Sequence, residues 1–281
     1  MLQPVIRYIE RSLVYRAPST KRGNWHSRWV DKEDVWFHAA DGTKIHGWFV
    51  PHAKPRHVIL YSHGNSEHVG DQVNTVLRLQ AMLDATVLVY DYRGYGHSEG
   101  KPTESGLISD GLAAQQWLAE RTGLLPEDIV LVGRSLGGGV SVAIAAERGA
   151  RALVLDATFS RMIDAARYNY PWLPVGLFMR DRYDSLARIA QYYGPVFQSH
   201  RTTDEVVPVD LARQVVELAP GEMKQFYEMP KGRHDDPLPA DYYSALNRFL
   251  NRLVATQPSA EHQPLVLAPT GGLTMATQAA S

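Results

Sequence analysis

The stretch LVGRSLGGG, residues 131–139, places Ser135 between Gly133 and Gly137, where an apolar strand-like run changes into a run of small, helix-compatible residues. A serine on a sharp turn between a strand and a helix has strained backbone angles, and small neighbours let the strand and helix approach each other. A Gly-rich turn with a solvated serine would explain the glycines too. In this context, however, the pattern G-x-S-x-G indicates a nucleophile.

A serine hydroxyl attacks a carbonyl only when a base removes its proton and an acid orients that base. Where the serine lies on such a turn, serine, acid and histidine follow one another along the chain. Three histidines follow Ser135, namely His200, His234 and His262. His262 falls in the C-terminal tail, and His200 ends a strand before an acid could follow the serine in this order. We therefore predict that His234, in MPKGRHDD, is the base.

The predicted acid is Asp204, in the loop RTTDEVVP that follows the apolar run PVFQSH. This loop and the loop of His234 both follow strands, so we expect them to face each other at the strand ends. Asp156, at the end of the preceding apolar run, is the alternative. Three further acids are expected to be solvated neighbours: Glu205, Asp235 and Asp236. Of these, Asp235 could raise the pKa of the imidazole through its charge.

The tetrahedral intermediate of such a reaction needs two N–H donors for its oxyanion. One is predicted to be the backbone N–H of Leu136, directly after the nucleophile. The other is predicted to be the backbone N–H of Asn65, in the loop SHGNSEH, where Gly64 lets the chain turn. The Asn65 side chain could also cap the following helix, and His63 is expected to buttress the loop.

Strands and helices that alternate along the chain must position these residues. Most of the apolar runs from residue 57 onward are continuously apolar, which is typical of strands buried on both faces of a parallel sheet. The predicted strands are 35–39, 43–50, 57–62, 86–91, 128–133, 151–156, 195–200 and 224–229, with helical patterns over 69–83, 107–118 and 242–253. The sequence therefore predicts an α/β fold with a doubly wound, mostly parallel sheet, and an N-terminal antiparallel hairpin around Asp41 and Gly42.

Residues 161–194 form an aromatic, proline-containing insertion that is too long for an ordinary connection. We expect a short lid, here called the lid segment, over the site. Its large side chains would form an apolar wall for the substrate: Tyr168, Tyr170, Trp172, Leu177 and Phe178, with Leu173 and Met179 beside them. The alternative is that these side chains only cover the sheet.

The two ends differ from the domain predicted over residues 30–254. Residues 1–29 are expected to form an arm that begins with a helix. Apolar residues recur there at helical spacing, at Val5, Ile6, Ile9 and Leu13. Charged residues interrupt this apolar pattern, at Arg7, Glu10 and Arg11. Those charges exclude a spanning helix and a secretory signal. The helix is expected either to pack on the domain or to lie on a membrane surface. Residues 255–281, rich in Pro, Thr, Gln and Ala, are predicted to be disordered.

The composition narrows the classes of function. Hydrophobic residues make up 44% and charged residues 21% of the 281 residues, the balance of a globular domain. A net charge of −1 without blocks of like charge argues against nucleic acid as a partner, and the lack of cysteine excludes thiol catalysis and thiolate metal sites. No histidine pair has the spacing H-E-x-x-H, which disfavours a metalloenzyme. We expect a cytoplasmic protein, with peripheral membrane contact as an alternative; the oligomeric state is left open.

The polar run YDYRGYGHSEG, residues 90–100, follows a predicted buried strand. Asp91 and Arg93 are expected to form an internal ion pair that holds the loop beside the site, without a direct catalytic part.

Taken together, these residues make the sequence resemble the α/β-hydrolase-fold serine hydrolases, and more narrowly the small α/β-hydrolase-domain proteins that include esterases and protein depalmitoylases. The resemblance covers roughly residues 30–253. It rests on motifs in family order: YSHGNSEH, DYRGYGHSEG, GRSLGGG, YPWLPVGLFMRDRYDSL, TTDEVVP and GRHDD. The motifs are specific for the fold and much less so for the substrate.

The resemblance implies a catalytic triad of Ser135, His234 and Asp204, oxyanion donors at Asn65 and Leu136, and no cofactor. The expected activity is that of a carboxylesterase acting on small-molecule esters with small-to-medium acyl chains. The alternatives are a lipid thioesterase or depalmitoylase at a membrane, a peptidase or lactonase on the same fold, and a noncatalytic binding protein. The sequence departs from the family at Arg201, where glycine is usual, and in lacking the N-terminal cysteines of the depalmitoylases.

Overall fold

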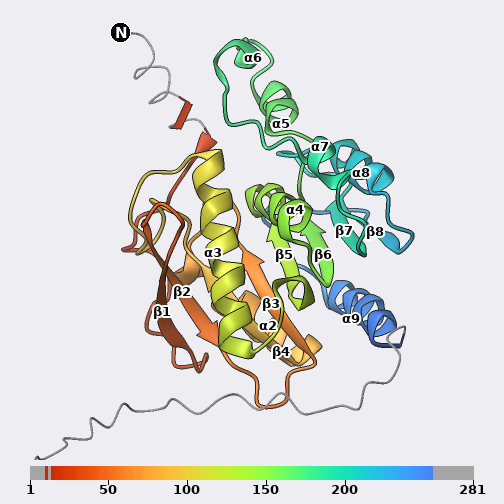
Figure 1. Ribbon diagram of the computed structural model, residues 1–281. Coiled ribbons are helices and arrows are strands. Elements are labelled where there is room, and N and C mark those ends of the chain that lie inside the picture. The colour runs from red at the N-terminus through yellow and green to blue at the C-terminus, as the bar shows by residue number, and fades with distance from the viewer. Residues whose placement is uncertain (1–9, 12–13, 256–281) are drawn as a thin grey trace, which may run out of the picture.

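A single eight-stranded sheet forms the centre of the protein in the computed structural model, which describes residues 10–11 and 14–255 (Figure 1). The strands are β1 (Glu33–His38), β2 (Lys44–Val50), β3 (His57–Ser62), β4 (Ala85–Tyr90), β5 (Val130–Arg134), β6 (Ala152–Asp156), β7 (Val196–Arg201) and β8 (Lys224–Met229). Their order across the sheet is β1-β2-β4-β3-β5-β6-β7-β8. Strands β3 to β8 run parallel, whereas β2 pairs antiparallel with both β1 and β4.

The strand sequences explain this arrangement. Every residue of β3, β4 and β6 is buried, as the continuous apolar runs predict for strands covered on both faces. In β1, by contrast, buried and exposed residues alternate towards its end, as expected for an edge strand with one face in water. The mostly parallel sheet with an N-terminal antiparallel hairpin is confirmed.

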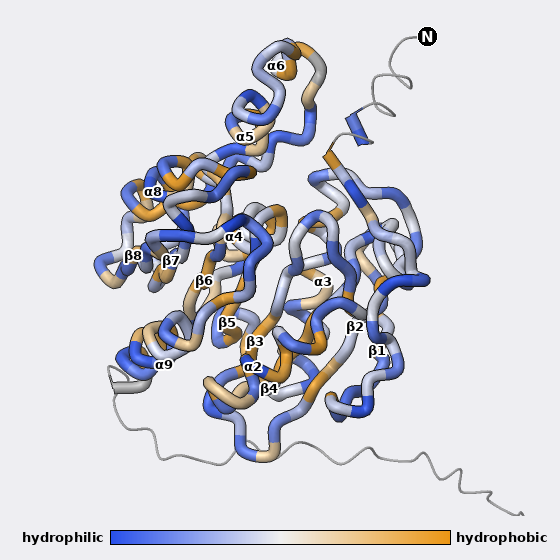
Figure 2. The backbone as a smooth tube through the Cα atoms, turned by 180° about the vertical axis from the view of Figure 1, so that it is seen from behind, coloured by the Kyte–Doolittle hydropathy of each residue, from blue (hydrophilic) through white to orange (hydrophobic). Residues whose placement is uncertain are grey.

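Helices cover both faces of the sheet. The helices are α2 (Val73–Leu83), α3 (Glu104–Thr122), α4 (Leu136–Arg148), α5 (Met162–Asn169), α6 (Val175–Phe178), α7 (Ser185–Ile189), α8 (Val209–Leu218) and α9 (Ala240–Ala255), with short 3-10 turns at η1 (Val69–Asp71) and η2 (Pro126–Asp128). One core joins the sheet to α3, α4, α7 and α8, and a second core joins it to α2 and α9. Figure 2, seen from behind, shows α2 and α9 in front of the sheet, with hydrophobic residues concentrated on the strands.

The lid segment connects β6 to β7 and carries α5, α6 and α7. In Figure 1, α5 and α6 stand beyond one end of the sheet, above α4. None of the described helices is both long and apolar enough to cross a membrane. Of the predicted N-terminal helix, Glu10 and Arg11 are described and helical, whereas Val5, Ile6, Ile9 and Leu13 lie outside the described residues, as does the predicted disordered tail after residue 255.

The predicted ion pair between Asp91 and Arg93 is wrong. Arg93 binds Asp110 of α3 at 2.8 Å and Asp41 at 2.7 Å, while Asp91 Oδ2 lies 2.9 Å from His46 Nδ1 on β2. The end of β4 lies beside the antiparallel strand β2, so the carboxylate faces that strand. Arg93 belongs to the following turn and reaches α3 instead.

Candidate active site

Ser135 occupies the turn between β5 and α4. Its backbone angles, φ 51° and ψ −115°, are unusual for a residue with a side chain. A Cβ atom at Gly133 would overlap the carbonyl oxygen of Gly137, and a Cβ atom at Gly137 would overlap that of Ser62 on β3. Only glycine therefore lets β5, α4 and β3 pack as closely as this turn requires.

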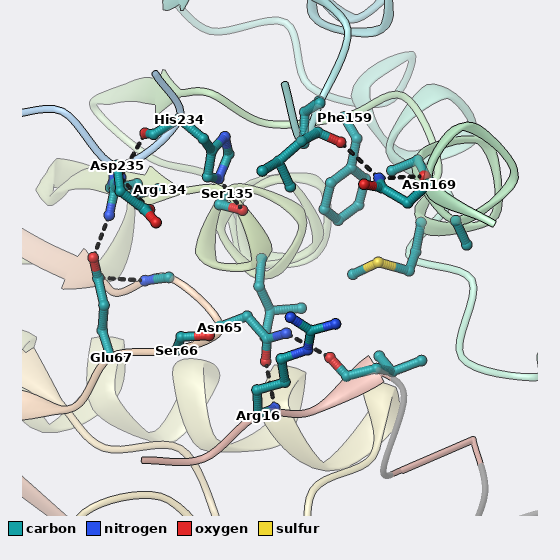
Figure 3. A pocket seen from close by; sticks show the side chains of 18 of the residues that line it. Arg16, Asn65, Ser66, Glu67, Arg134, Ser135, Phe159, Asn169, His234 and Asp235 are labelled. Carbon is teal, nitrogen blue, oxygen red and sulfur yellow. Dashed lines mark hydrogen bonds and ion pairs between the residues drawn. The ribbon is translucent and has the colours of Figure 1, made fainter. Parts of the chain in front are cut away.

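The structure brings Ser135, His234 and Asp204 into one hydrogen-bonded chain. Figure 3 shows Ser135 and His234 side by side at the cavity. His234 Nε2 lies 3.1 Å from Ser135 Oγ, and His234 Nδ1 lies 2.7 Å from Asp204 Oδ2. The histidine and the acid come from loops after β8 and β7, which are neighbours in the sheet. In this geometry the imidazole can accept the serine proton at Nε2 while Nδ1–H donates to the carboxylate.

The surroundings of Asp204 keep its carboxyl group ionised. Burial alone would raise its pKa, but hydrogen bonds with His200 and His234, the charge of His234 and the N–H of Val207 hold that pKa well below its usual range. Its Oδ1 accepts hydrogen bonds from the backbone N–H groups of Val206 and Val207, both at 2.8 Å. The carboxylate is thus oriented before it meets the imidazole.

Arg134 links the loop of His234 to the loop after β3, a role that was not predicted from the sequence. Its Nη2 donates to the carbonyl oxygen of His234 at 2.7 Å and to Asp235 Oδ1 at 3.1 Å, and its Nη1 donates to Glu67. Glu67 Oε2 in turn accepts the N–H of Gly64 at 2.8 Å, in the loop after β3. The available signal was a charged residue at the end of a buried strand, directly before the nucleophile.

The two predicted oxyanion donors, Leu136 and Asn65, line the same cavity as Ser135. Leu136 is the first residue of α4, where backbone N–H groups lack helical partners and the helix dipole is positive. The Asn65 side chain does not cap the following helix. Its Oδ1 accepts from Tyr95 Oη at 2.7 Å and from the N–H of Arg16 at 3.0 Å, so it fixes the loop against other segments.

The remaining candidates lie around this chain of hydrogen bonds. Asp156 Oδ1 accepts the hydroxyl of Ser199 at 2.7 Å, so the alternative acid is engaged away from the imidazole. Glu205 Oε2 accepts the N–H of His234 at 3.1 Å. His63 is buried, with Nδ1 2.8 Å from the carbonyl oxygen of Gly64.

Arg201, at the end of β7, connects the loop of Asp204 to the loop of His234. Its Nη2 donates to the carbonyl oxygens of Asp236 at 2.7 Å and Pro237 at 3.1 Å. The side chain passes beneath Gly232, where a Cβ atom would lie 2.7 Å from Arg201 Cδ. This side chain therefore links β7 to the segment that carries His234.

A cavity of about 820 Å³ opens in front of Ser135. Its apolar wall comes largely from the lid segment and from the loop after Asp204, and it includes Phe159, Met162, Ala165, Ala166, Leu173, Val175, Met179, Val206 and Val207. Figure 3 shows Phe159 and Asn169 on the side opposite Arg134 and Asp235. The site thus has an apolar side and a charged side, with the serine between them.

The predicted wall is only partly correct. Tyr170 lines the cavity, but Tyr168, Trp172 and Leu177 do not; their exposed fractions are 54%, 77% and 81%. The side chain of Phe178 lies outside the described residues. The physical reason lies in α5, which turns Met162, Ala165, Ala166 and Asn169 to the cavity, a helical spacing that leaves Tyr168 on another face.

Among the described residues, no group of three or more histidine, aspartate and glutamate side chains is placed to hold a metal ion.

The sheet, the strained serine turn and the hydrogen-bonded chain define an α/β-hydrolase. The sequence matches the family described as alpha/beta hydrolase fold over residues 57–185, and the chain belongs to this family. It is 30% identical over 236 residues to alpha/beta hydrolase domain-containing protein 17C of Mus musculus, covering 83% of this chain and 72% of that protein. It is 35% identical over 222 residues to an uncharacterised protein of Mycobacterium tuberculosis, covering 77% of this chain and 78% of that protein.

Solved structures share the fold at low sequence identity. The esterase Pf2001 of Pyrococcus furiosus superposes with a TM-score of 0.71 at 20% identity, covering 85% of this chain and 97% of that chain. The acetyl xylan esterase from Paenibacillus sp. R4 superposes with a TM-score of 0.65 at 18% identity, covering 82% of this chain and 86% of that chain.

Proposed function

We propose that this protein is a serine hydrolase that cleaves carboxylic esters with small-to-medium acyl chains through a covalent acyl-enzyme. The observation that carries the proposal is the chain from Ser135 through His234 to Asp204, with distances of 3.1 and 2.7 Å, at a strained turn that faces the cavity. Membership of the α/β-hydrolase family and the fold shared with esterases support it.

In the first half of the reaction, Ser135 Oγ attacks the ester carbonyl carbon while His234 Nε2 accepts the hydroxyl proton. The ionised carboxylate of Asp204 stabilises the resulting imidazolium. The backbone N–H groups of Leu136 and Asn65 are proposed to donate to the oxyanion. The intermediate collapses as the imidazolium gives its proton to the leaving alcohol, which leaves the acyl group on the serine.

In the second half, a water molecule takes the place of the alcohol. His234 removes a proton from the water as it attacks the acyl carbon, and then returns that proton to Ser135 Oγ as the acid leaves. The apolar wall of the lid segment is proposed to bind the acyl chain, since the volume of the cavity is in the range of small-molecule sites.

The test is intact-mass spectrometry after treatment with a fluorophosphonate. The protein is expected to gain one adduct, Ser135→Ala to gain none, and Ser105→Ala, which changes an exposed serine of α3, to behave like the unmodified chain. A series of 4-nitrophenyl esters from two to twelve carbons would then define the acyl preference. An adduct on Ser135→Ala, or more than a tenth of the turnover retained by it, would refute the proposed nucleophile.

A second candidate is a lipid thioesterase or depalmitoylase that works at a membrane surface. Tyr168, Trp172 and Leu177 favour it, because these large side chains are exposed on the lid segment that also covers the cavity. Flotation with anionic phospholipid vesicles would test the membrane contact. Trp172→Ser should then weaken binding, and Trp29→Ser, at an equally exposed tryptophan outside the lid segment, should not. Equal flotation of the unmodified protein, Trp172→Ser and Trp29→Ser, or flotation of none of them, would count against this candidate.

A further inference from the structure

The N-terminal segment Val14–Arg16 is part of the cavity rather than a separate arm. Val14 and Tyr15 are buried, and Val14 and Arg16 line the cavity. The Tyr15 hydroxyl donates to Asp181 of the lid segment at 2.9 Å. The Asn65 side chain binds the carbonyl oxygen of Val14 at 2.6 Å and the N–H of Arg16 at 3.0 Å. The backbone of Arg16 is thus held beside the loop proposed to bind the oxyanion.

The guanidinium of Arg16 points into the cavity, between Asn65 and the apolar wall (Figure 3). Its Nη2 donates to the Tyr170 hydroxyl at 2.8 Å. Within the part of the chain that the structure describes, no carboxylate lies within 4.0 Å of this guanidinium. Its protein partner is therefore neutral, and the residue is exposed where it lines the cavity.

The other arginines of the cavity are already neutralised. Arg22 binds Asp71 at 2.9 Å, and Arg134 binds Glu67 and Asp235. The cavity thus presents two cations in ion pairs and a third, Arg16, that has no acid partner among the described residues. The remaining acid of the cavity, Glu10, accepts the backbone N–H of Asp181 at 2.8 Å and that of Arg180. A guanidinium has five N–H donors in a planar fork that matches a carboxylate or a phosphate.

From this charge pattern we propose that the substrate carries an anionic group, a carboxylate or a phosphate, which Arg16 binds while an apolar chain lies against the lid segment. The inference rests on the proposed ester hydrolysis and adds the substrate class. Tyr170 would hold the guanidinium in place for this contact. Charge-assisted hydrogen bonds of this kind correspond to a change of about tenfold to a hundredfold in kcat/KM.

Two matched pairs of esters distinguish the source of the anion. Monooctyl succinate against octyl butanoate tests a carboxylate on the acyl side. 1-Octanoylglycerol 3-phosphate against 1-octanoylglycerol tests a phosphate on the alcohol side. The protein should prefer the charged member of at least one pair, and the pair that shows the preference identifies the side of the ester that meets Arg16.

The variant Arg16→Gln should lower kcat/KM for the preferred anionic ester by about tenfold to a hundredfold and leave its neutral partner within about threefold. Arg16→Lys should keep part of the preference, and Arg28→Gln, at an exposed position outside the cavity, should keep all of it. Equal losses on charged and neutral esters would show a structural role and overturn the proposal, as would the absence of a preference in both pairs.

Failure of the proposed hydrolysis gives a different result. Fluorophosphonate labelling of Ser135 in Arg16→Gln reports the catalytic serine independently of the anion. Calorimetric binding of both pairs to Ser135→Ala measures the same preference without turnover. A protein that is not labelled but still binds the anionic ester through Arg16 would refute the hydrolysis and support the anion site. A protein that is labelled but shows no preference for the anionic ester would support the hydrolysis and refute the anion site.

Discussion

Replacement of Arg134 by methionine tests whether the loop of His234 must be held from the side of the nucleophile. Methionine keeps much of the side-chain length and removes the hydrogen bonds to His234, Asp235 and Glu67. A hydrogen bond from a charged donor contributes about 1.5–3 kcal/mol. If the bond to the His234 carbonyl serves the transition state, kcat/KM should fall by about tenfold to a hundredfold, at 1.36 kcal/mol for each tenfold.

The assay is steady-state hydrolysis of a 4-nitrophenyl ester together with thermal unfolding. The loss should lie in kcat rather than in KM, because the imidazole transfers protons in the transition state and does not hold the substrate. Arg121→Met is the matched control, since it breaks the ion pair with Glu33 of β1 and leaves the site intact. A kcat within threefold of the original, with a lower melting temperature, would show that Arg134 serves stability alone and would refute the reasoning.

Three further predictions concern the acid, the serine turn and a buried histidine. Asp204→Asn should lower kcat by about 10⁴-fold, whereas Asp156→Asn should cost less than tenfold; similar losses in ester hydrolysis would contradict the assignment of the acid. Gly137→Ala should abolish soluble, active protein, whereas Gly42→Ala, with nothing within 4 Å of the added Cβ, should lower the free energy of unfolding by only about 1 kcal/mol in denaturant titrations. Burial lowers the pKa of His57 to about 4. As the pH falls, the unfolded chain therefore takes up a proton on this imidazole before the folded protein does. Up to about 3 kcal/mol of the free energy of unfolding should be lost between pH 6.5 and 4. His57→Leu should flatten that part of the curve of melting temperature against pH, and parallel curves would exclude the effect.

The fold could be predicted because its signals are local. Continuous apolar runs identify buried parallel strands, and the short Asp-Gly turn identifies the antiparallel hairpin. The order of Ser135, Asp204 and His234 along the chain was enough to propose their proximity, since the loops after neighbouring parallel strands meet at one end of the sheet. The catalytic roles of these residues stay predictions until the serine is labelled.

The partners of individual side chains could not be predicted, because they depend on where whole elements lie. The large apolar residues of the lid segment, such as Tyr168 and Trp172, were expected to face the substrate, since their burial is favourable. The position of α5 over the cavity instead turns smaller side chains inward. In the same way, nothing in the sequence around Asn65 indicates that its side chain holds the N-terminal segment.

The cavity is lined by segments from both ends of the described chain, with Arg16 near the start and His234 near the end. During synthesis on the ribosome, Ser135 emerges long before the histidine that the proposed reaction requires. A chain that has not yet reached residue 234 would hold a serine without its base, and so the proposed activity would arise only after His234 has been synthesised. Products truncated before His234 would accordingly be inert towards esters, because they lack the base of the proposed reaction.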